Sequence, residues 1–392
     1  MDRLVARIAS ACYGTVNAAL QVCALLLWPR ARPLDAKRVC VYRIGNLGDI
    51  VCALPAMQAV RRAYPDAALT LVSSPGDRAR QGAADVVQGI GWIDDLRLYY
   101  ADDIATVAGR LALLRDLRRR RFDVWIELPD DLATPWRQAR NMLFVKLAGA
   151  RWARGWRVST LKWAGRAQSK HLRFADEVER TLGIVEGAGI DARGVDAALP
   201  RSPLARAKIE GLLRSSGSVR RPRIAIAPGA TRSTNRWPEE RFVALGERLS
   251  AAGCGVVLIG SRSEMQVAKA IAAQIGTGAS SFAGQLSVLE SSELLRHCDT
   301  AICLDSAVQH LAAAVGTPVI SLFPAWQLRG KWHPHGRGNV VIRKDVPCDT
   351  CFRDACPNGN RCMTSIHVEE VAARVLAAFA PVAAEERSCA SS

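Results

Sequence analysis

The sequence predicts an α/β protein built on two doubly wound parallel sheets. Three observations support this prediction. The chain has 392 residues, more than one ordinary core requires. From residue 38 onward, short apolar runs alternate with helical periods, and this alternation weakens at residues 199–222 before it restarts. With 49% hydrophobic and 23% charged residues, the composition is that of a globular protein.

Strand and helix positions follow from the spacing of the apolar residues. In the first half, strands are expected at residues 39–42, 69–72 and 124–128, and helices at 50–64 and 104–120. In the second half, strands are expected at 224–227, 256–259, 301–304 and 319–323, and helices at 239–252, 263–275 and 306–315. Because strands alternate with helices, each sheet is expected to be parallel. Ligands of such sheets bind beyond the carboxyl ends of the strands, here in a cleft between the halves.

The first 36 residues have a different pattern. An apolar stretch at residues 18–28 lies between Arg3 and Arg7 on one side and Arg30 and Arg32 on the other. No small-residue cleavage site follows it, and polar residues interrupt it, so neither a signal peptide nor an unbroken transmembrane span is indicated. We expect an amphipathic helix on the cytoplasmic leaflet of a membrane. A helix packed on the body of the protein is the alternative.

Positive charge dominates the composition, with a formal net charge of +16. The stretch from Arg110 to Arg173 holds 16 basic and 5 acidic residues, including the run at 118–121 and the Arg/Trp segment at 151–157. Such charge favours anionic partners. It is either a solvated surface or a patch for phosphate-bearing acceptors or lipid headgroups, with tryptophans at interfacial depth. Because no nucleic-acid-binding module accompanies it, we expect no nucleic-acid partner.

The twelve cysteines do not form the pattern of a secreted disulfide framework, and they fit a reducing cytoplasm. Seven stand singly in apolar surroundings and are expected to be small buried side chains: Cys12, Cys23, Cys40, Cys52, Cys254, Cys298 and Cys303. Four others stand close together: Cys348, Cys351, Cys356 and Cys362. Four thiols at this spacing are able to hold a structural zinc ion, and reduced free thiols are the alternative.

Three loops carry side chains suited to chemistry at the cleft. The first follows the first strand and contains Arg43, Asn46, Gly48 and Asp49. Its glycines allow the backbone to turn tightly beside a ligand. Asp49, at the start of the next helix, is either a helix cap or a base that accepts a proton from a hydroxyl group. The helix dipole is expected to keep its carboxylate ionised at neutral pH.

The other two loops lie in the second half. Residues 227–238 follow its first strand and offer small residues, hydroxyl groups and cations to an anion: Gly229, Thr231, Arg232, Asn235 and Arg236. An ordinary strand-to-helix loop is the alternative. Residues 304–318 place Asp305 at a strand end, Ser306 as a helix cap and His310 one turn later, where a packed helix residue is the alternative.

Taken in order, these three loops resemble glycosyltransferase family 9, the ADP-heptose:lipopolysaccharide heptosyltransferase family. The resemblance spans roughly residues 38–379, and Gly260 and Glu264 also fit it. Its motifs are Gly48-Asp49-Ile50 with Leu54-Pro55, Pro228-Gly229-Ala230 with Arg236-Trp237-Pro238, and Asp305-Ser306 with His310-Leu311-Ala312-Ala313-Ala314 and Gly316-Thr317-Pro318.

The resemblance implies a GT-B fold of two Rossmann-like domains facing a cleft. With the sequence pattern, it predicts an N-terminal amphipathic helix at 1–36, an acceptor-binding domain at 37–200, a linker at 201–222, a nucleotide-sugar-binding domain at 223–380 and a disordered tail at 381–392. Asp49 matches the catalytic base of the family, and Arg43, Asn46 and Gly48 belong to the acceptor-side loop. Similar cysteine-rich segments in the family favour a structural rather than a catalytic metal.

The reaction that the resemblance implies is an inverting, metal-independent sugar transfer without a required cofactor. The donor would be ADP-heptose or another nucleotide sugar, and the acceptor an anionic lipid-linked glycan. The enzyme would work in the cytoplasm, peripherally on the bacterial inner membrane.

Two positions depart from the family pattern. The family usually has a lysine where this chain has Asn235, and Asp-Thr-Gly where it has Asp305-Ser306-Ala307. Because an amide does not neutralise a diphosphate, Arg232 or Arg236 is expected to replace the lysine. These departures imply a branch with another donor or acceptor. An epimerase-like GT-B enzyme and a non-catalytic membrane-associated binding protein are the alternative functions.

Overall fold

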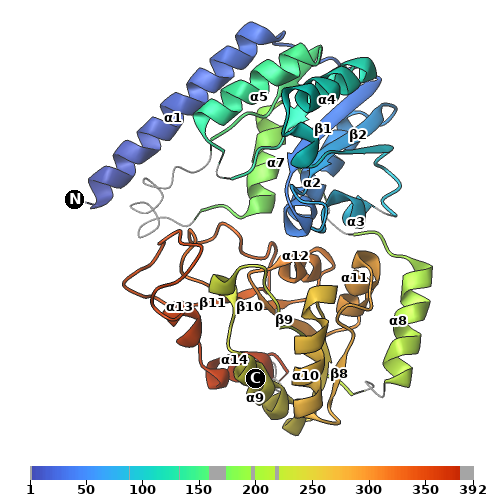
Figure 1. The fold of residues 1–392 in the computed structure, drawn as a ribbon, viewed down its shortest axis with the longest axis vertical. Helices are drawn as coiled ribbons and strands as arrows, with labels where there is room; N and C mark the ends of the chain where they lie inside the picture. Colours follow the sequence, from blue (N-terminus) through green and yellow to red (C-terminus); the bar gives the residue numbers. More distant parts are fainter. Residues whose placement is uncertain are drawn as a thin grey trace, which may run out of the picture.

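The computed structural model describes residues 2–87, 89–131, 133–158, 174–195, 199–216 and 220–379. Within these residues the chain forms two α/β domains that face each other (Figure 1). The upper half of the figure contains strands β1 to β5, and the lower half contains β6 to β11. The predicted fold class, two doubly wound parallel sheets, is confirmed.

The sheet of the N-terminal domain has the order β3-β2-β1-β4-β5, and all its described pairs are parallel. Its strands are β1 (Arg38–Ile44), β2 (Ala68–Ser74), β3 (Asp95–Leu98), β4 (Val124–Glu127) and β5 (Trp152–Arg154). Its helices are α2 (Leu47–Ala63), α3 (Ala83–Val87), α4 (Val107–Arg120), α5 (Pro135–Leu147) and α7 (Glu177–Gly187). Val39, Cys40 and Val41 of the central strand β1 are buried, as expected where helices cover both faces of a parallel sheet.

The sheet of the C-terminal domain has the order β11-β10-β9-β6-β7-β8 and is parallel as well. Its strands are β6 (Arg223–Ala227), β7 (Gly255–Leu258), β8 (Ala279–Ser281), β9 (Thr300–Leu304), β10 (Val319–Phe323) and β11 (Val340–Arg343). Its helices are α9 (Glu239–Ala251), α10 (Met265–Ile275), α11 (Val288–Arg296), α12 (Ala307–Ala314), α13 (Arg361–Thr364) and α14 (Val368–Ala377).

Helices at the domain boundary join the two halves. Helix α8 (Pro203–Ser215) occupies most of the stretch predicted as a linker, and it packs on α11. Helix α2 contacts α7 on its own side and α12 across the cleft. A Cβ atom at Gly48 would lie 3.2 Å from Cδ2 of His310, so the first turns of α2 and α12 meet closely. The two sets of strand ends therefore face one shared space.

Helix α1 (Asp2–Leu27) packs along the N-terminal domain beside α5 (Figure 1). Leu20, Ala24 and Trp28 are buried, and the Trp28 ring stacks on Trp156 with 5.0 Å between centroids. The packed-helix alternative therefore holds for one face of α1. In the part of the chain that the structure describes, no helix is long and apolar enough to cross a membrane.

Two expectations about individual side chains were wrong. Trp152 and Trp156, which one of the two alternatives placed at interfacial depth, are buried, because the Arg/Trp segment supplies the edge strand β5 and the residues that follow it. Among the seven single cysteines, Cys23 is exposed and Cys12 is half-buried, because both lie on α1, which the body covers on one side only. The predicted tail at 381–392 lies outside the described residues.

Candidate active site

A cleft of about 1150 Å³ separates the two domains, and both contribute to its walls. Most of the predicted site residues line it. From the N-terminal domain these are Asn46, Gly48 and Asp49, and from the C-terminal domain Gly229, Thr231, Arg232, Asn235, Asp305, Ser306 and His310. The loops that follow β1, β6 and β9 bring them together, as expected for the carboxyl ends of parallel strands.

Asp49 lines the cleft and also closes the capping box of α2, in which Asn46 is the N-cap residue. One carboxylate oxygen, Oδ2, accepts a hydrogen bond of 3.0 Å from the backbone N–H of Asn46 at the start of α2. The other, Oδ1, accepts a bond of 3.1 Å from the Arg43 guanidinium. Gly45 makes this packing feasible, since a Cβ atom there would lie 2.3 Å from the Cβ of Asp49. The side chain keeps 22% of its surface exposed.

The environment of Asp49 shifts its protonation toward neutral pH. Burial raises the pKa of Asp49 to about 6, the Arg43 cation opposes this shift, and the negative charge of Glu177 adds to it. With a pKa of about 6, the Asp49 carboxylate is mostly ionised at pH 7. Its pKa is nevertheless raised and not lowered, because burial has a larger effect than the hydrogen bond at the helix start. A carboxylate with a pKa near the working pH is suited to accept a proton.

Arg43 lies beneath Asp49 and not in the cleft. Its side chain is fully buried, and among the described residues it is not one that lines the cleft. Its guanidinium donates to the backbone oxygen of Pro129 at 2.8 Å, to Glu177 at 2.8 Å and to Asp49. The prediction of Arg43 as an acceptor-loop contact is therefore corrected: its bonds position the Asp49 carboxylate.

Glu177 anchors this buried network. Although burial alone would raise the pKa of Glu177, the cations of Arg180 and Arg43 lower it to about 2. Arg180 binds Glu177 through two nitrogens, the closer at 2.5 Å. A buried carboxylate that stays ionised requires such pairing. Glu177 thus fixes Arg43, and Arg43 fixes Asp49.

In the C-terminal domain, the loop after β6 presents Thr231 and Arg232 to the cleft. The Arg232 guanidinium lies 4.8 Å from the ring centroid of Trp326 and pairs with Asp354. Arg236 is exposed and is not among the described residues that line the cleft; its Nε atom donates to the Ala230 oxygen at 3.3 Å. Of the two arginines expected to replace the family lysine, only Arg232 is placed to do so.

Asn235 has a structural role. It is 4% exposed, and its amide nitrogen donates to the backbone oxygen and to Oδ2 of Asp305, at 2.9 and 3.1 Å. Its amide oxygen accepts a 2.6 Å bond from the indole of Trp326. With these bonds made, the side chain ties the loop after β6 to the end of β9.

Asp305, Ser306 and His310 occupy the opposite wall. Burial raises the pKa of Asp305 to about 7, against hydrogen bonds from Gln327, Asn235 and Gln309. Ser306 precedes α12 but makes no side-chain cap bond, so that expectation was wrong. Its buried hydroxyl has no hydrogen-bond partner within the described residues. Burial lowers the pKa of His310 to about 4, so its ring is neutral at pH 7.

Several cleft residues were not predicted as site residues. Lys331 follows β10 and is 3% exposed, with Nζ 3.9 Å from Oδ2 of Asp131 in the other domain. Arg80 follows β2, and Arg262 follows β7. They belong to no motif, but each follows a strand of the two sheets. The rule that ligands bind at these strand ends was the one signal available for finding them.

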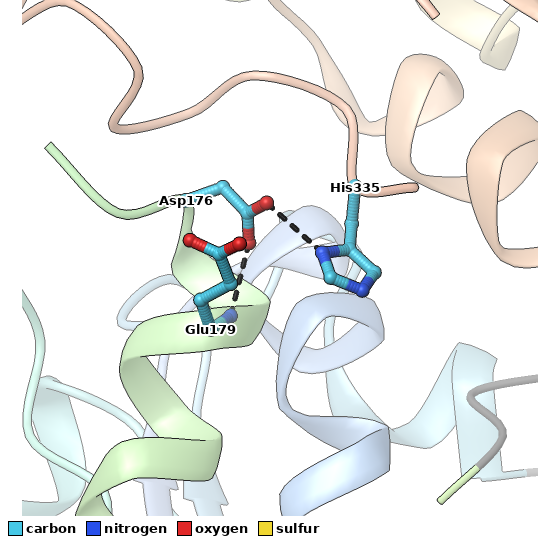
Figure 2. A group of neighbouring side chains, drawn as sticks. All are labelled: Asp176, Glu179 and His335. Atoms are coloured by element: carbon cyan, nitrogen blue, oxygen red, sulfur yellow. Dashed lines mark hydrogen bonds and ion pairs between the residues drawn. The ribbon is translucent and has the colours of Figure 1, made fainter. Parts of the chain in front are cut away.

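A second contact joins the domains beside the cleft. His335 Nδ1 lies 2.9 Å from Oδ2 of Asp176, the residue before α7, and Asp176 also accepts the N–H of Glu179 (Figure 2). Potential ligand atoms of these three side chains lie within 4.8 Å of one another. The hydrogen bond with Asp176 raises the pKa of His335. Protonation of His335 therefore strengthens this link between the domains.

The four clustered cysteines do not line the cleft between the domains. Cys348, Cys351, Cys356 and Cys362 all line one small pocket of about 20 Å³ behind Trp326. Within the described part of the chain, their sulfurs do not form a group as compact as the one at His335. The zinc expectation stays a prediction: the thiols share a pocket but do not enclose a formed site.

The fold and the cleft define the class of protein. Two Rossmann-like domains with strand ends facing one cleft form a GT-B fold, and solved glycosyltransferases share it. A family 9 glycosyltransferase from Veillonella parvula has a TM-score of 0.67 and 18% identity, covering 89% of this chain and 100% of its own. Escherichia coli heptosyltransferase WaaC, solved with ADP-2-deoxy-2-fluoro heptose, has a TM-score of 0.59 and 18% identity, covering 87% and 99%.

The family model named glycosyltransferase family 9 (heptosyltransferase) matches residues 110–361, so the chain belongs to this family. Lipopolysaccharide heptosyltransferase 3 of Escherichia coli is 24% identical over 291 residues, which cover 71% of this chain and 81% of that protein. The dodecameric iron-containing heptosyltransferase TibC, solved with ADP-D-beta-D-heptose, has a TM-score of 0.52 and 15% identity, covering 89% and 77%. The resemblance identified from the three loops is confirmed.

Proposed function

We propose that this glycosyltransferase moves a heptose-like sugar from a nucleotide-activated donor to a hydroxyl group of lipopolysaccharide or another cell-envelope glycan, with inversion. One observation carries the proposal: the Asp49 carboxylate of one domain faces, across a single cleft, the anion-suited loops of the other. Lipopolysaccharide is named because the relative from Escherichia coli carries that name. The N-terminal domain would bind the acceptor, and the C-terminal domain the donor.

The donor would lie along the loops after β6 and β9. Gly229 lets the backbone pass close to Glu264, since a Cβ atom there would lie 2.0 Å from the Glu264 carboxyl carbon. The diphosphate would meet the Thr231 and Ser306 hydroxyls and the Arg232 guanidinium, with Lys331 as a further cation on the same cleft wall. Asn235 would support this wall through Asp305 without contacting phosphate.

The reaction follows from the position of the base. Asp49 accepts the proton of the acceptor hydroxyl while that oxygen attacks the anomeric carbon of the donor. The bond from this carbon to the phosphate oxygen breaks on the opposite side, which inverts the configuration. The nucleoside diphosphate leaves with its negative charge facing Arg232 and Lys331, which stabilise it in a cleft shielded from water. The proton remains on Asp49 until product release.

ADP-heptose is the first donor to test, because two solved relatives were determined with ADP-linked heptoses. The chain nevertheless lacks the family lysine at Asn235 and has Ser306-Ala307 after Asp305. Another sugar or nucleotide on the same diphosphate would fit these changes, since both lie on the donor side of the cleft.

We further propose that catalysis needs no metal and that a structural zinc ion binds the four cysteines. The cleft carboxylates are already engaged by protein groups: Asp49 by Arg43, Asp131 by Lys331, and Asp305 by amides. Thiolates are suitable zinc ligands, and the four cysteines share one pocket. The expected location is peripheral, on the cytoplasmic face of the inner membrane.

A thermal-shift screen with ADP-, UDP-, GDP- and dTDP-sugars tests the donor assignment. The proposal expects stabilisation by one nucleotide class, about 2.7 kcal/mol at a ligand concentration 100 times the dissociation constant. Release of the matching nucleoside diphosphate only when a glycan acceptor is present would support transfer. Interconversion of the sugar nucleotide without an acceptor would instead indicate an epimerase. Binding without turnover would indicate a non-catalytic protein.

A further inference from the structure

Helix α1 is apolar on two opposite faces, and the protein covers one of them. The inner face is held by Leu20, Ala24 and Trp28 in the core and by polar contacts. Asn17 donates to the backbone oxygen of Val158 at 2.9 Å and accepts its N–H at 2.8 Å. These bonds fix the rotation of α1 about its axis, and with it the face that points outward.

The outer face of α1 is a long apolar stripe. Its large exposed residues, with their exposed fractions, are Leu4 (63%), Ile8 (51%), Val22 (56%), Leu25 (40%) and Leu26 (81%). At 3.6 residues per turn, their spacing places them on one side of the helix, over a length of about 33 Å. Thr15 lies on the same side, but its hydroxyl is satisfied by the Ala11 oxygen at 3.1 Å. From Ile8 to Pro29 the sequence contains no charged residue.

Helix α5 continues this apolar surface. Trp136, Leu143 and Leu147 are 78%, 59% and 48% exposed and recur at helical spacing. The helices lie side by side (Figure 1), and Lys146 Nζ donates to the Leu27 oxygen at 2.6 Å. This bond joins the C-terminal ends of α1 and α5. Leu26 and Leu147 are adjacent in sequence to the two bonded residues. We call these outward apolar side chains of α1 and α5 the α1/α5 face.

Charge identifies the partner of this face. Arg7, Arg30 and Arg140 are exposed on or beside it. No acidic residue occurs between Asp2 and Asp35, and none occurs in α5. An apolar stripe whose own helices carry cations, and no acidic residue from Arg3 to Leu34 or in α5, matches an anionic lipid surface, where apolar side chains enter the acyl boundary and cations meet phosphate groups. A second protein copy would bring the same cations against themselves.

We propose that the α1/α5 face docks the enzyme on an anionic lipid bilayer, with α1 lying along its surface. This inference names the surface behind the proposed peripheral location, but it does not depend on the transfer reaction. The docked face and the proposed acceptor side of the cleft belong to the same domain. Helix α5 begins four residues after Asp131, and Asp131 lines the cleft. A lipid-linked acceptor would then reach Asp49 from the membrane on which the enzyme rests.

Sedimentation with phosphatidylcholine vesicles, with and without phosphatidylglycerol, tests the proposal on the full chain. The wild-type protein is expected to bind the anionic vesicles. Val22→Glu and Leu143→Glu should each weaken binding about tenfold or more, since a charge replaces an inserted apolar group. Leu204→Glu is the matched control, because Leu204 is 85% exposed on α8, away from this face, and it should bind like the wild type.

Three outcomes would overturn the proposal: no binding of the wild type to vesicles, equal binding by the α1/α5 variants, or a wild-type dimer that Val22→Glu dissociates. The last would show that the face joins two copies of the chain. Unchanged thermal unfolding of the variants checks that they fold. Their stabilisation by the donor nucleotide checks the cleft separately, so failure of docking is distinguishable from failure of the proposed reaction.

Discussion

Asn235 donates two hydrogen bonds from its side-chain amide to Asp305, one to the backbone oxygen at 2.9 Å and one to the carboxylate at 3.1 Å. This contact links the two loops that form the proposed donor wall. The Asn235 side chain is 4% exposed and both its amide atoms bond to protein groups, so it supports the cleft wall through Asp305 and Trp326.

Substitution of this amide should therefore affect stability. Asn235→Ala removes the partner of the Asp305 backbone oxygen and of the Trp326 indole, while the Asp305 carboxylate keeps its bonds from Gln327 and Gln309. Each unsatisfied buried group costs about 1–3 kcal/mol. Denaturant unfolding should show a loss in this range. Gln274→Ala, which removes an exposed side chain on α10, serves as control and should change little. Equal stability of wild type and Asn235→Ala would contradict the structural role.

Arg232 and Arg236 should differ in their effect on donor binding. Arg232 lines the cleft and Arg236 does not, although both stand in the same loop. Arg232→Gln should weaken binding of a nucleoside diphosphate by about tenfold, as expected for a charge-assisted contact. Arg236→Gln should bind like the wild type in the same calorimetric titration. If Arg236→Gln weakened binding and Arg232→Gln did not, Arg236 would be the arginine that contacts the phosphate.

The pH dependence of transfer should report Asp49. Because the base acts when deprotonated and its pKa is raised to about 6, kcat/KM should fall as the pH drops through 6. Glu177→Gln removes a negative charge that raises this pKa, so the acidic limb should move to lower pH. Glu179→Gln, an exposed neighbour on α7, should leave the limb in place. A limb that does not respond to Glu177→Gln would point to another group, such as Asp305.

Zinc should be present if the four cysteines form a metal site. Elemental analysis of protein purified without chelator is expected to give about one zinc ion per chain. Cys351→Ser should lose the ion and lower the melting temperature, whereas Cys254→Ser, at a buried cysteine distant in sequence, should retain it. If the wild-type protein contains no zinc and Cys351→Ser melts at the same temperature as the wild type, the thiols are reduced and unliganded.

The central strands could be predicted from the sequence because their apolar runs are continuous. Sequence reasoning located β1, β6, β9 and β10 to within a residue or two, and the loops after β1, β6 and β9 proved to share one cleft. It missed the short edge strands β3, β5, β8 and β11. Edge strands are paired on one side and carry mixed residues, so periodicity identifies them poorly.

The side-chain roles were harder to predict because they depend on contacts distant in sequence. Arg43 donates a hydrogen bond to Glu177, which is 134 residues away in sequence, and no local sequence pattern predicts this pair. Likewise, Lys331 reaches the cleft only because the domains face each other, with Asp131 as its partner. Asp49, by contrast, was identifiable because its loop, its helix position and the family resemblance agreed.

Asp49→Asn tests the central claim most directly. The amide keeps the shape of the carboxylate but cannot accept the proton, so the rate of sugar transfer should fall by about 10²–10⁴-fold. Donor binding, measured by calorimetry, should be unchanged, because the donor loops belong to the other domain. Asp191→Asn, at a residue on the surface, is the control and should transfer normally. Transfer by Asp49→Asn at the wild-type rate would contradict the assignment of the base.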